Sequence, residues 1–555
     1  MAAAIAATTL GQGLGSGIGF FSALVALVAG SLCWRSFGSV RPEVSLGIVD
    51  LLTAFVLVAY AAWQFSFVVF DHGRSVLTLT RYNYGDLPLH WTYIAHFDRG
   101  ASFWPETPIL TGARLRYPFG VDLLSALLLR SGLSLEWVLR GSGVAFSFCL
   151  AAALLYWGRG FAVAAFLFSG GVLGLRFFAT GVLEDANADL AWKNLFLALF
   201  LPQRGFLFAL PAGLVLLGSW RERFLRREGR PLPALAEALL LGSLPLFHLH
   251  TFALVSLVGG AWATLGPWRK GLRTMALALA PATWAVWQVT EGFRAAGLVW
   301  WKAGWMLGDA ALPIFLAENF GLWLVLWAMA AYGATRDATL EDRATLASGL
   351  IGFVLFFFLM LAPWEWDNTK VLLWCFLLTV PAVWSLVLAG RSLAVRIAIV
   401  SLLLVPQVPC LLAAARGGDA RLEVFRRDEL DDVCAATKGI PVSSRVATAQ
   451  TFNHPVALCG QPIVAGYAGH LWSHGYDAKA VEADLATVLD GAAGWQEAAR
   501  RVRAEYVFWG ARERADHPRS TRAWLETGSI VHNGRFGILV KLNTDGTAVP
   551  GTDPR

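Results

Sequence analysis

The sequence predicts a mainly α-helical polytopic membrane protein with a small C-terminal α/β domain. Hydrophobic residues make up 56% of the 555 residues and charged residues only 15%, whereas a soluble domain carries about 25% charged residues. The apolar residues fall in runs of about 18–25, long enough to cross about 30 Å of hydrocarbon. The runs stop near residue 413, and the remaining tail has short apolar stretches and mixed charges.

Hydropathy and spacing predict about twelve transmembrane helices. Because Arg35 follows the run Ile18–Trp34 and no basic residue precedes it, we expect this run to be a retained span and not a cleaved signal. The expected spans are residues 17–34, 46–70, 137–157, 160–177, 203–220, 232–248, 250–266, 274–289, 313–333, 345–363, 371–390 and 397–413.

Arginines in alternate gaps between the spans predict the orientation. These gaps carry Arg35, Arg41, Arg159, Arg221, Arg223, Arg226, Arg227, Arg230, Arg269, Lys270, Arg273, Arg336, Arg343, Arg391 and Arg396. By the positive-inside rule they are cytoplasmic. This placement accounts for most of the net charge of +6, so we do not expect a nucleic-acid partner.

The orientation divides the chain into two expected domains. Residues 1–414 form the transmembrane domain, with outer loops 71–136, 178–202, 290–312 and 363–370, and residues 415–555 form an extracytoplasmic domain. Within the second domain we expect strands at 444–449, 462–467 and 506–509 and helices at 478–490 and 495–503. Cys434 and Cys459 are the only cysteines of this domain, and in an oxidising compartment they can form a disulfide.

The first outer loop contains the first candidate for a catalytic residue. Asp86 and His90 lie in Tyr82–His90, at the start of an expected interfacial helix that continues to Arg99. The motif Arg116-Tyr117-Pro-Phe follows, and residues 121–129 form a second expected helix of this kind. Asp86 is either the N-cap of its helix or a base and metal ligand at the membrane surface.

The second outer loop is acidic. It contains Glu184, Asp185 and Asp189, with Lys193 as the next basic residue. Such carboxylates either bind a divalent ion through oxygen ligands or form a solvated loop. Arg204 opens the next span, where it can pair with a phosphate or anchor the helix at the interface.

Two further segments place polar side chains at the outer ends of spans. His248 and His250 suit phosphate or hydroxyl binding or a structural role, and two ligands alone are weak evidence for a metal. The turn 363–370 contains Trp366, Asp367, Asn368 and Lys370. Polar groups at membrane level are costly, so this turn is a candidate functional site.

Glycine, aromatic and histidine residues are concentrated at 466–475 in the C-terminal domain. Tyr467, Trp472 and His474 lie in this segment. The segment is either a tight turn with a small aromatic core or a wall of the acceptor site. Taken together, acids, cations and aromatic groups on one outer face suit a substrate with a lipid tail and a phosphate head.

The layout resembles the GT-C superfamily of integral-membrane glycosyltransferases, which use polyprenyl-phosphate-linked sugars. The resemblance rests on the many spans, the long first outer loop with interfacial helices and an acid, the acidic second loop and the C-terminal outer domain. The motifs Tyr84–His90, Arg116–Phe119, Trp366–Lys370 and Gly466–Gly475 are similar to those of bacterial membrane proteins of this type. The architecture is similar to dolichyl-phosphate-mannose-protein mannosyltransferases and oligosaccharyltransferases.

The resemblance implies an inverting glycosyltransferase of the bacterial inner membrane. Its donor would be a polyprenyl-phosphate sugar and its acceptor a glycan, lipid or protein at the outer face. Asp86 would be the general base, Glu184 and Asp185 would assist, and Asp86 with Asp185 would hold a divalent cation, Mg²⁺ or Mn²⁺, if one is used. The expected substrate-binding residues are His90, Arg116, Tyr117, Arg204, His248, His250, Trp366, Asp367, Asn368, Lys370, Tyr467, Trp472 and His474.

Two other functions fit parts of the sequence. A transporter or flippase of a lipid-linked sugar would place ionisable groups at mid-membrane, where Glu237 and Glu318 are the candidates. A non-catalytic scaffold of an envelope-assembly complex would keep the fold and tolerate neutralisation of Asp86, Glu184, Asp185 and Asp367.

Overall fold

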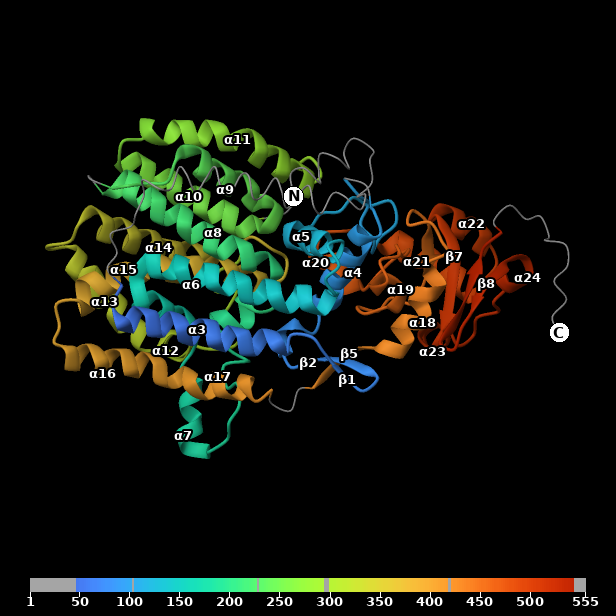
Figure 1. The fold of residues 1–555 in the computed structure, drawn as a ribbon, viewed down its shortest axis with the longest axis horizontal. Helices are drawn as coiled ribbons and strands as arrows, with labels where there is room; N and C mark the ends of the chain where they lie inside the picture. Colours follow the sequence, from blue (N-terminus) through green and yellow to red (C-terminus); the bar gives the residue numbers. More distant parts are fainter. Residues whose placement is uncertain (1–45, 102–103, 227–228, 294–298, 418–420, 544–555) are drawn as a thin grey trace.

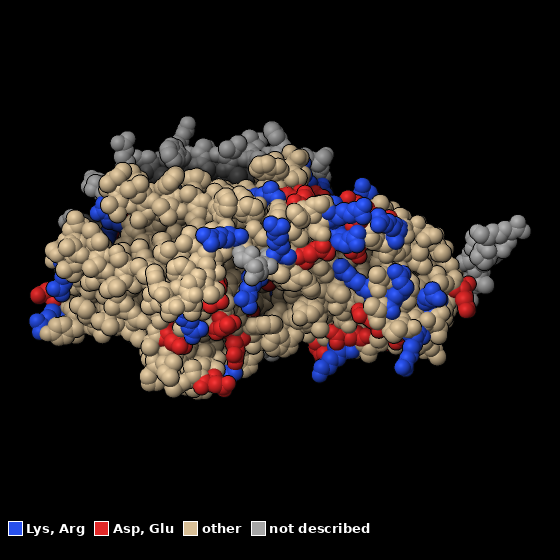
Figure 2. Space-filling view, turned by 90° about the horizontal axis from the view of Figure 1, so that it is seen from below, with Lys and Arg blue, Asp and Glu red and all other residues tan. Residues whose placement is uncertain are grey.

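The computed structural model describes residues 46–101, 104–226, 229–293, 299–417 and 421–543. A bundle of apolar helices occupies one end of the molecule and the C-terminal strands and short helices occupy the other, with α4 and α5 between them (Figure 1). The flank of the bundle is nearly free of Lys, Arg, Asp and Glu, which gather at its far end and over the C-terminal part (Figure 2). This distribution is typical of an integral membrane protein.

The bundle contains most of the helices that the hydropathy pattern predicts. Its longer elements are α3 (Ile48–Ser66), α6 (Leu135–Leu167), α8 (Arg204–Trp220), α9 (Ala234–Phe247), α10 (Leu249–Leu265), α11 (Arg269–Val289), α12 (Leu312–Phe320), α13 (Leu322–Ala334), α14 (Leu340–Phe358), α15 (Thr369–Val383), α16 (Leu393–Leu404) and α17 (Val408–Ala415). The shorter ones are η2 (Leu173–Arg176), α7 (Phe177–Thr180), η3 (Phe196–Phe200), η4 (Arg221–Leu225), η5 (Glu365–Asn368), η6 (Trp384–Leu388), η7 (Val405–Gln407) and the strands β3 (Trp300–Trp301) and β4 (Leu359–Met360).

Fewer helices than twelve are long and apolar enough to cross a membrane unaided. Within the described residues there are four, at 48–66, 135–167, 365–388 and 393–415. A fifth arises if α12 and α13, which are bent by 92° at Gly321, form one broken span. Helices α9 and α10 are apolar but shorter. The span expected at 17–34 lies outside the described residues.

The span expected at 160–177 is wrong in its second half. The helix that begins after the break at Gly158 and Arg159 ends at Leu167. The chain then passes through Ser169 and Gly170, and Gly170 has a φ of +127°, a backbone angle that glycine adopts and a helix excludes. Residues 168–177 are apolar enough to continue the helix, but the local backbone prevents it.

The first outer loop folds into a strand pair and two helices. These are β1 (Phe70–His72), β2 (Ser75–Thr78), η1 (Arg81–Asn83), α4 (Asp86–Asp98) and α5 (Gly120–Leu129). The C-terminal strand β5 (Leu422–Arg426) pairs antiparallel with β2 and completes the sheet β1-β2-β5. The loop and the C-terminal part therefore share one sheet.

The rest of the C-terminal part is built on a four-stranded sheet. Its elements are α18 (Arg427–Thr437), β6 (Arg445–Ala447), α19 (Pro455–Leu458), α20 (Ala468–Ser473), α21 (Lys479–Asp490), α22 (Trp495–Arg501), β7 (Ala504–Gly510), α23 (Ala511–Asp516), α24 (Trp524–Thr527), β8 (Ser529–Asn533) and β9 (Gly537–Lys541). The strand order is β6-β7-β9-β8, with β6 and β7 parallel and the other neighbours antiparallel.

The strand expected at 462–467 is wrong. Ile463 and Ala465 form only isolated bridges, to Val446 and Leu110. The Ile463 N–H donates to the Pro108 carbonyl and the Gly466 N–H to the Ile109 carbonyl, both at 2.8 Å. The segment is extended and too irregular to be a strand: it bonds to Val446 of β6 on one side and to the first outer loop on the other.

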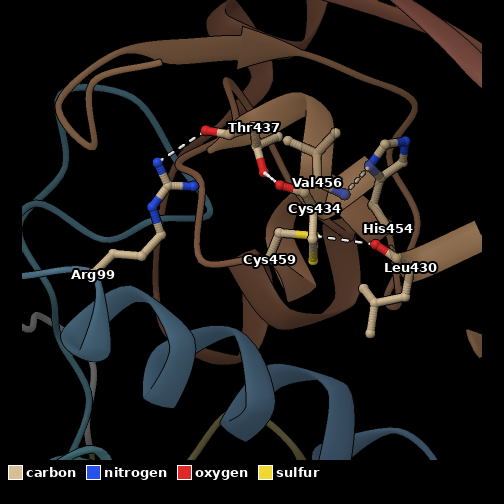
Figure 3. The surroundings of a disulfide bond; sticks show 7 residues. All are labelled: Arg99, Leu430, Cys434, Thr437, His454, Val456 and Cys459. Carbon is tan, nitrogen blue, oxygen red and sulfur yellow. Dashed lines mark hydrogen bonds between the residues drawn. A yellow bond between two sulfur atoms is a disulfide. The ribbon is translucent and has the colours of Figure 1, made fainter. Parts of the chain in front are cut away.

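Cys434 and Cys459 form a disulfide, as their position in the sequence allows (Figure 3). It ties α18 to the end of α19, and α19 packs on α4. Close by, Arg99, which caps α4, donates from Nη2 to the carbonyls of Thr437 and Ile440 at 3.1 and 3.0 Å. The disulfide therefore holds α18 to α19 within the C-terminal part, and Arg99 with the packing of α19 holds this unit to α4, the helix that begins at Asp86.

Replacing both Cys434 and Cys459 by serine is expected to destabilise this attachment. The cross-link closes a loop with a sequence separation of 25 residues, and a closure of that length is worth about 3 kcal/mol. The Tm of the purified protein should fall, and limited proteolysis should cut between 434 and 459 sooner. Cys149→Ser, which removes a free and exposed thiol, is the control. Equal Tm values for the two variants would contradict the expectation.

Candidate functional site

Helix α4 presents Asp86 and His90 on one face, because residues four apart lie one turn apart on a helix. Asp86 is the first residue of α4 and Gly85 is its N-cap, without a side-chain cap hydrogen bond. The interpretation of Asp86 as an N-cap is therefore wrong. Its carboxylate Oδ2 instead accepts a hydrogen bond from Gln203 Nε2 at 3.1 Å.

The surroundings of Asp86 raise its pKa. Burial among protein atoms is the main cause, and the nearby carboxylate of Asp367 adds to it. The charges of His90 and Lys370 act in the opposite direction without reversing the shift. The side chain still keeps part of its surface accessible to solvent. A half-buried carboxylate with a raised pKa is a better proton acceptor than an exposed one.

His90 and Arg204 meet at a carboxylate that the sequence did not single out. Asp122 on α5 is 1% exposed. It accepts from His90 Nδ1 at 2.9 Å and from Arg204 Nε at 3.3 Å. Arg204 Nη2 also donates to Ser125 at 2.6 Å. The sequence did carry a signal for Asp122: it is a single acidic residue in the apolar run 121–129, and burying a charge without a partner costs free energy.

The two histidines predicted at an outer helix end lie in the same region. The Thr251 N–H donates to His248 Nδ1 at 3.1 Å, which places the ring proton of neutral His248 on Nε2. Neither His248 Nε2 nor His250 Nε2 has a hydrogen-bond partner among the described residues. Buried polar groups are normally paired, so these two nitrogens are available to a ligand.

The turn 363–370 places a buried cation beside these histidines. Lys370 Nζ lies 2.7 Å from Asp367 Oδ1, and the charge of Lys370 acts on Asp86, His248 and His250. The Lys193 ammonium lies over the Trp366 ring, 4.9 Å from the ring centroid. Asn368 is used within the turn, since its side chain bonds to the backbone of Leu361, Ala362 and Trp364.

Helix α20 of the C-terminal part covers the site. The His474 ring lies 4.9 Å from the Tyr117 ring, which in turn lies 5.7 Å from His90. Burial lowers the pKa of His470 to about 4, against a smaller opposite effect of the Gly85 backbone. Burial likewise lowers the pKa of His474 to about 3. Both imidazoles are therefore neutral at pH 7, and His474 Nδ1 has no hydrogen-bond partner among the described residues.

Some of the residues predicted to bind substrate or assist catalysis have their contacts away from Asp86. Arg116 bonds to Glu291 and to the Gly475 carbonyl, so it fastens the C-terminal part to the loop after α11. Glu184 is exposed. Asp185 accepts from the Tyr82 hydroxyl at 2.8 Å, and the groups whose pKa it influences are Tyr60, Tyr82, Lys193 and Cys410. Tyr467 and Trp472 are 44% and 52% exposed.

The residues proposed for a metal do not form a shared site. Asp86 is held by Gln203 and Asp185 by Tyr82, each within its own set of neighbours. No group of three or more His, Cys, Asp or Glu residues within the described ranges is arranged to hold a metal ion. Neither Asp86 nor Asp185 belongs to such a group among the described residues, and their role as metal ligands stays a prediction.

Comparison with known proteins identifies similar folds only. No family model and no curated protein matches the chain. One similar solved structure is that of the archaeal oligosaccharyltransferase AglB from Archaeoglobus fulgidus in complex with an inhibitory peptide and a dolichol-phosphate. It is 13% identical in sequence with a TM-score of 0.47, and the alignment covers 84% of this chain and 70% of that chain. The mycobacterial arabinofuranosyltransferase AftD is 14% identical with a TM-score of 0.46.

The alignment with AftD covers 89% of this chain and 40% of AftD, so the chain spans less than half of that protein. The apo form of the Archaeoglobus fulgidus oligosaccharyltransferase is 11% identical with a TM-score of 0.42, and the alignment covers 88% and 74% of the two chains. The names of these three proteins are those of oligosaccharyl- and arabinofuranosyltransferases.

Proposed function

We propose that this protein is a membrane glycosyltransferase that transfers a sugar from a polyprenyl-phosphate donor to an acceptor at the outer face of the membrane. One observation carries the proposal. Asp86, with its raised pKa, lies in one site with the buried cation Lys370 and the unpaired imidazole nitrogens of His248 and His250. A base and a set of phosphate-binding groups are what such a transfer requires.

The reaction proposed here is a single displacement with inversion. Asp86 takes the proton of the acceptor hydroxyl while the acceptor oxygen bonds to the anomeric carbon of the donor. The bond from that carbon to the phosphate oxygen breaks, and the electron pair leaves with the lipid phosphate. Lys370 and the His248 Nε2–H stabilise the resulting charge. Arg204 is occupied by Asp122 and Ser125, so we assign it to positioning of His90 and α5.

The position of the site along the bundle supports its placement at the outer face of the membrane. Helix α8 begins with Arg204 at the site and ends next to η4, where Arg221 and Arg226 lie with Glu341. Its 17 residues span about 25 Å. The arginine-rich gap thus lies at the far end of the helix, and the positive-inside rule places it in the cytoplasm.

The placement of the C-terminal part is proposed on two grounds. It adjoins the site end of the bundle, and it contains a disulfide, which persists in oxidising compartments. We therefore propose that residues 415–555 are extracytoplasmic and residues 1–414 transmembrane, in a bacterial inner membrane. The acceptor, whether glycan, lipid or protein, would approach from this side.

The transporter alternative loses one of its two candidate carboxylates, Glu237. Glu237 is fully buried on α9, and it accepts hydrogen bonds from Arg223 at 2.7 Å and Thr274 at 2.8 Å as well as from Ser219. A carboxylate with three partners is occupied in holding helices together. Asn319, beside Glu318, is likewise bonded to the Trp192 N–H and the Phe315 carbonyl.

A transfer assay tests the proposal. The purified full-length protein in liposomes is given radiolabelled polyprenyl-phosphate sugars and crude envelope acceptors, with Asp86→Asn alongside. Donor consumption by the wild type alone is the expected result. Movement of the lipid-linked sugar across the bilayer without its consumption would indicate a transporter, and equal consumption by both proteins would remove Asp86 from the mechanism.

Lys370→Met is expected to move the acid limb of the pH–rate profile to higher pH. The Lys370 charge lowers the pKa of Asp86, so its removal raises that pKa further. A base is active only when deprotonated, and activity is lost as pH falls through its pKa. Lys302→Met removes an exposed lysine that pairs with Glu365 and should leave the limb unmoved. A limb that stays in place in Lys370→Met would show that Asp86 does not set it.

A further inference from the structure

Five aromatic side chains come from segments that adjoin the Asp86 site, and we call them the aromatic rim. They come from three separate parts of the chain: Tyr84 from the first outer loop, Trp364 from the turn before α15, and Phe452, Tyr467 and Trp472 from the C-terminal part. Trp364, Tyr467 and Trp472 are 48%, 44% and 52% exposed. Large aromatic surfaces left uncovered in this way mark binding sites more often than chance positions.

The rim consists of two arcs of neighbouring rings. In the first, the centroids of Tyr84 and Phe452 are 5.0 Å apart and those of Phe452 and Tyr467 6.3 Å apart. In the second, Trp364 and Trp472 are 5.7 Å apart. Tyr467 precedes α20 and Trp472 lies within it, so this short helix joins the arcs.

Both arcs connect directly to the site. Tyr84 is two residues before Asp86, and the Gly85 backbone between them is among the groups that act on the pKa of His470 on α20. The His470 ring also lies 5.2 Å from the Tyr467 ring. At the other arc, Trp364 belongs to the turn that ends in Lys370. A molecule lying on the rim would therefore place one end at Asp86.

We propose that the aromatic rim binds a glycan chain, and that the acceptor of this enzyme is therefore a saccharide. The inference rests on the proposed function and names the class of its acceptor. Each sugar ring has an apolar C–H face that packs on an aromatic ring, while its hydroxyls bond to water or to polar tips such as the Tyr467 hydroxyl. The rim residues carry no charge, which suits a neutral polyhydroxyl chain.

The arrangement favours a glycan over a lipid surface. Three of the five rings belong to residues 452–472, which follow the last apolar helix, and α20 lies beside α4 and α5 where the C-terminal part meets the bundle (Figure 1). An interfacial anchor would place its rings around the bundle at headgroup level. The rim instead groups its rings by contact, Tyr84 with Phe452 and Tyr467 and Trp364 with Trp472, in segments next to those that carry Asp86 and Lys370.

A direct binding measurement tests the rim without relying on catalysis. Neutral oligosaccharides of graded length are titrated into the full-length protein, and binding is followed by tryptophan fluorescence and calorimetry. We expect affinity to rise with chain length, and Trp472→Ala and Phe452→Ala each to weaken it about tenfold, as for central aromatic contacts at an interface. Trp137→Ala, which removes a tryptophan that is 68% exposed at the start of α6, is the matched control and should bind as the wild type does.

The outcomes separate this inference from the proposed function. At saturating donor, Trp472→Ala should raise the KM for an oligosaccharide acceptor, whereas Trp137→Ala should leave that KM unchanged. If donor is consumed but no oligosaccharide binds, the rim proposal fails and the transferase stands. If the rim variants instead lose binding to protein-free vesicles of anionic lipid, the rim is a membrane anchor and the proposal is overturned. Oligosaccharide binding without any donor turnover would support the rim and contradict the transferase.

Discussion

Replacement of Asp86 by asparagine is expected to lower sugar transfer by about 100-fold or more, the contribution that a positioned general base makes. Asparagine has nearly the size of aspartate, and its amide oxygen can still accept from Gln203 Nε2, which lies 3.1 Å from the carboxylate. The fold should therefore persist while the proton acceptor is lost. Turnover of the lipid-linked donor and the Tm in detergent are measured together.

Asp98→Asn is the matched control for this substitution. Asp98 ends the same helix and lies near Arg130, well away from the base. Its replacement should leave turnover near the wild-type rate. If Asp86→Asn kept full turnover, the base would have to be sought elsewhere, with His90 on the next turn as the first alternative.

Asp122→Asn is expected to reduce the stability of the protein more than any surface substitution. Arg204 is 6% exposed and His90 is 2% exposed, and both bond to the Asp122 carboxylate. The neutral amide would leave the Arg204 charge buried without its partner, which costs about 3 kcal/mol. The Tm should fall clearly, and donor turnover should fall with it because His90 and α5 lose their anchor.

Asp484→Asn provides the comparison for Asp122→Asn. Asp484 pairs with Arg501 at the surface, where an ion pair contributes little, so its Tm should match that of the wild type. If the Tm values of the two variants agreed, the buried cluster of Asp122, His90 and Arg204 would not be a stabilising element.

The sequence predicts an integral membrane protein because composition and the length of apolar runs reflect the solvent around the chain. Both can be read without knowing the tertiary contacts. The helices at 86–98 and 120–129, the strand at 504–510 and the helix at 479–490 were likewise predicted to within a few residues. The number of spans is not confirmed within the described residues, and hydropathy alone does not reveal a backbone break such as that at Ser169 and Gly170 or the bend at Gly321.

The sequence predicted which residues belong to the site better than it predicted which of them contact one another. Asp86, His248, His250 and Lys370 come from segments far apart in the sequence, and nothing in their spacing shows that they share one electrostatic environment. Asp122 and Gln203 were missed because each gains its role only from a partner on another helix. Conversely, Arg116 and Asn368 looked like binding residues, but the structure uses both to hold loops.

The pairing of β2 with β5 has a consequence for how the protein is made. Ser75 on β2 bonds to Glu423 on β5, 348 residues further along the chain, and Ile463 and Gly466 bond to the loop just after α4. During synthesis, the segment bearing Asp86 is therefore made long before the strand and helices that hold it in place. The contacts between this segment and the C-terminal part can form only when nearly the whole chain has been synthesised.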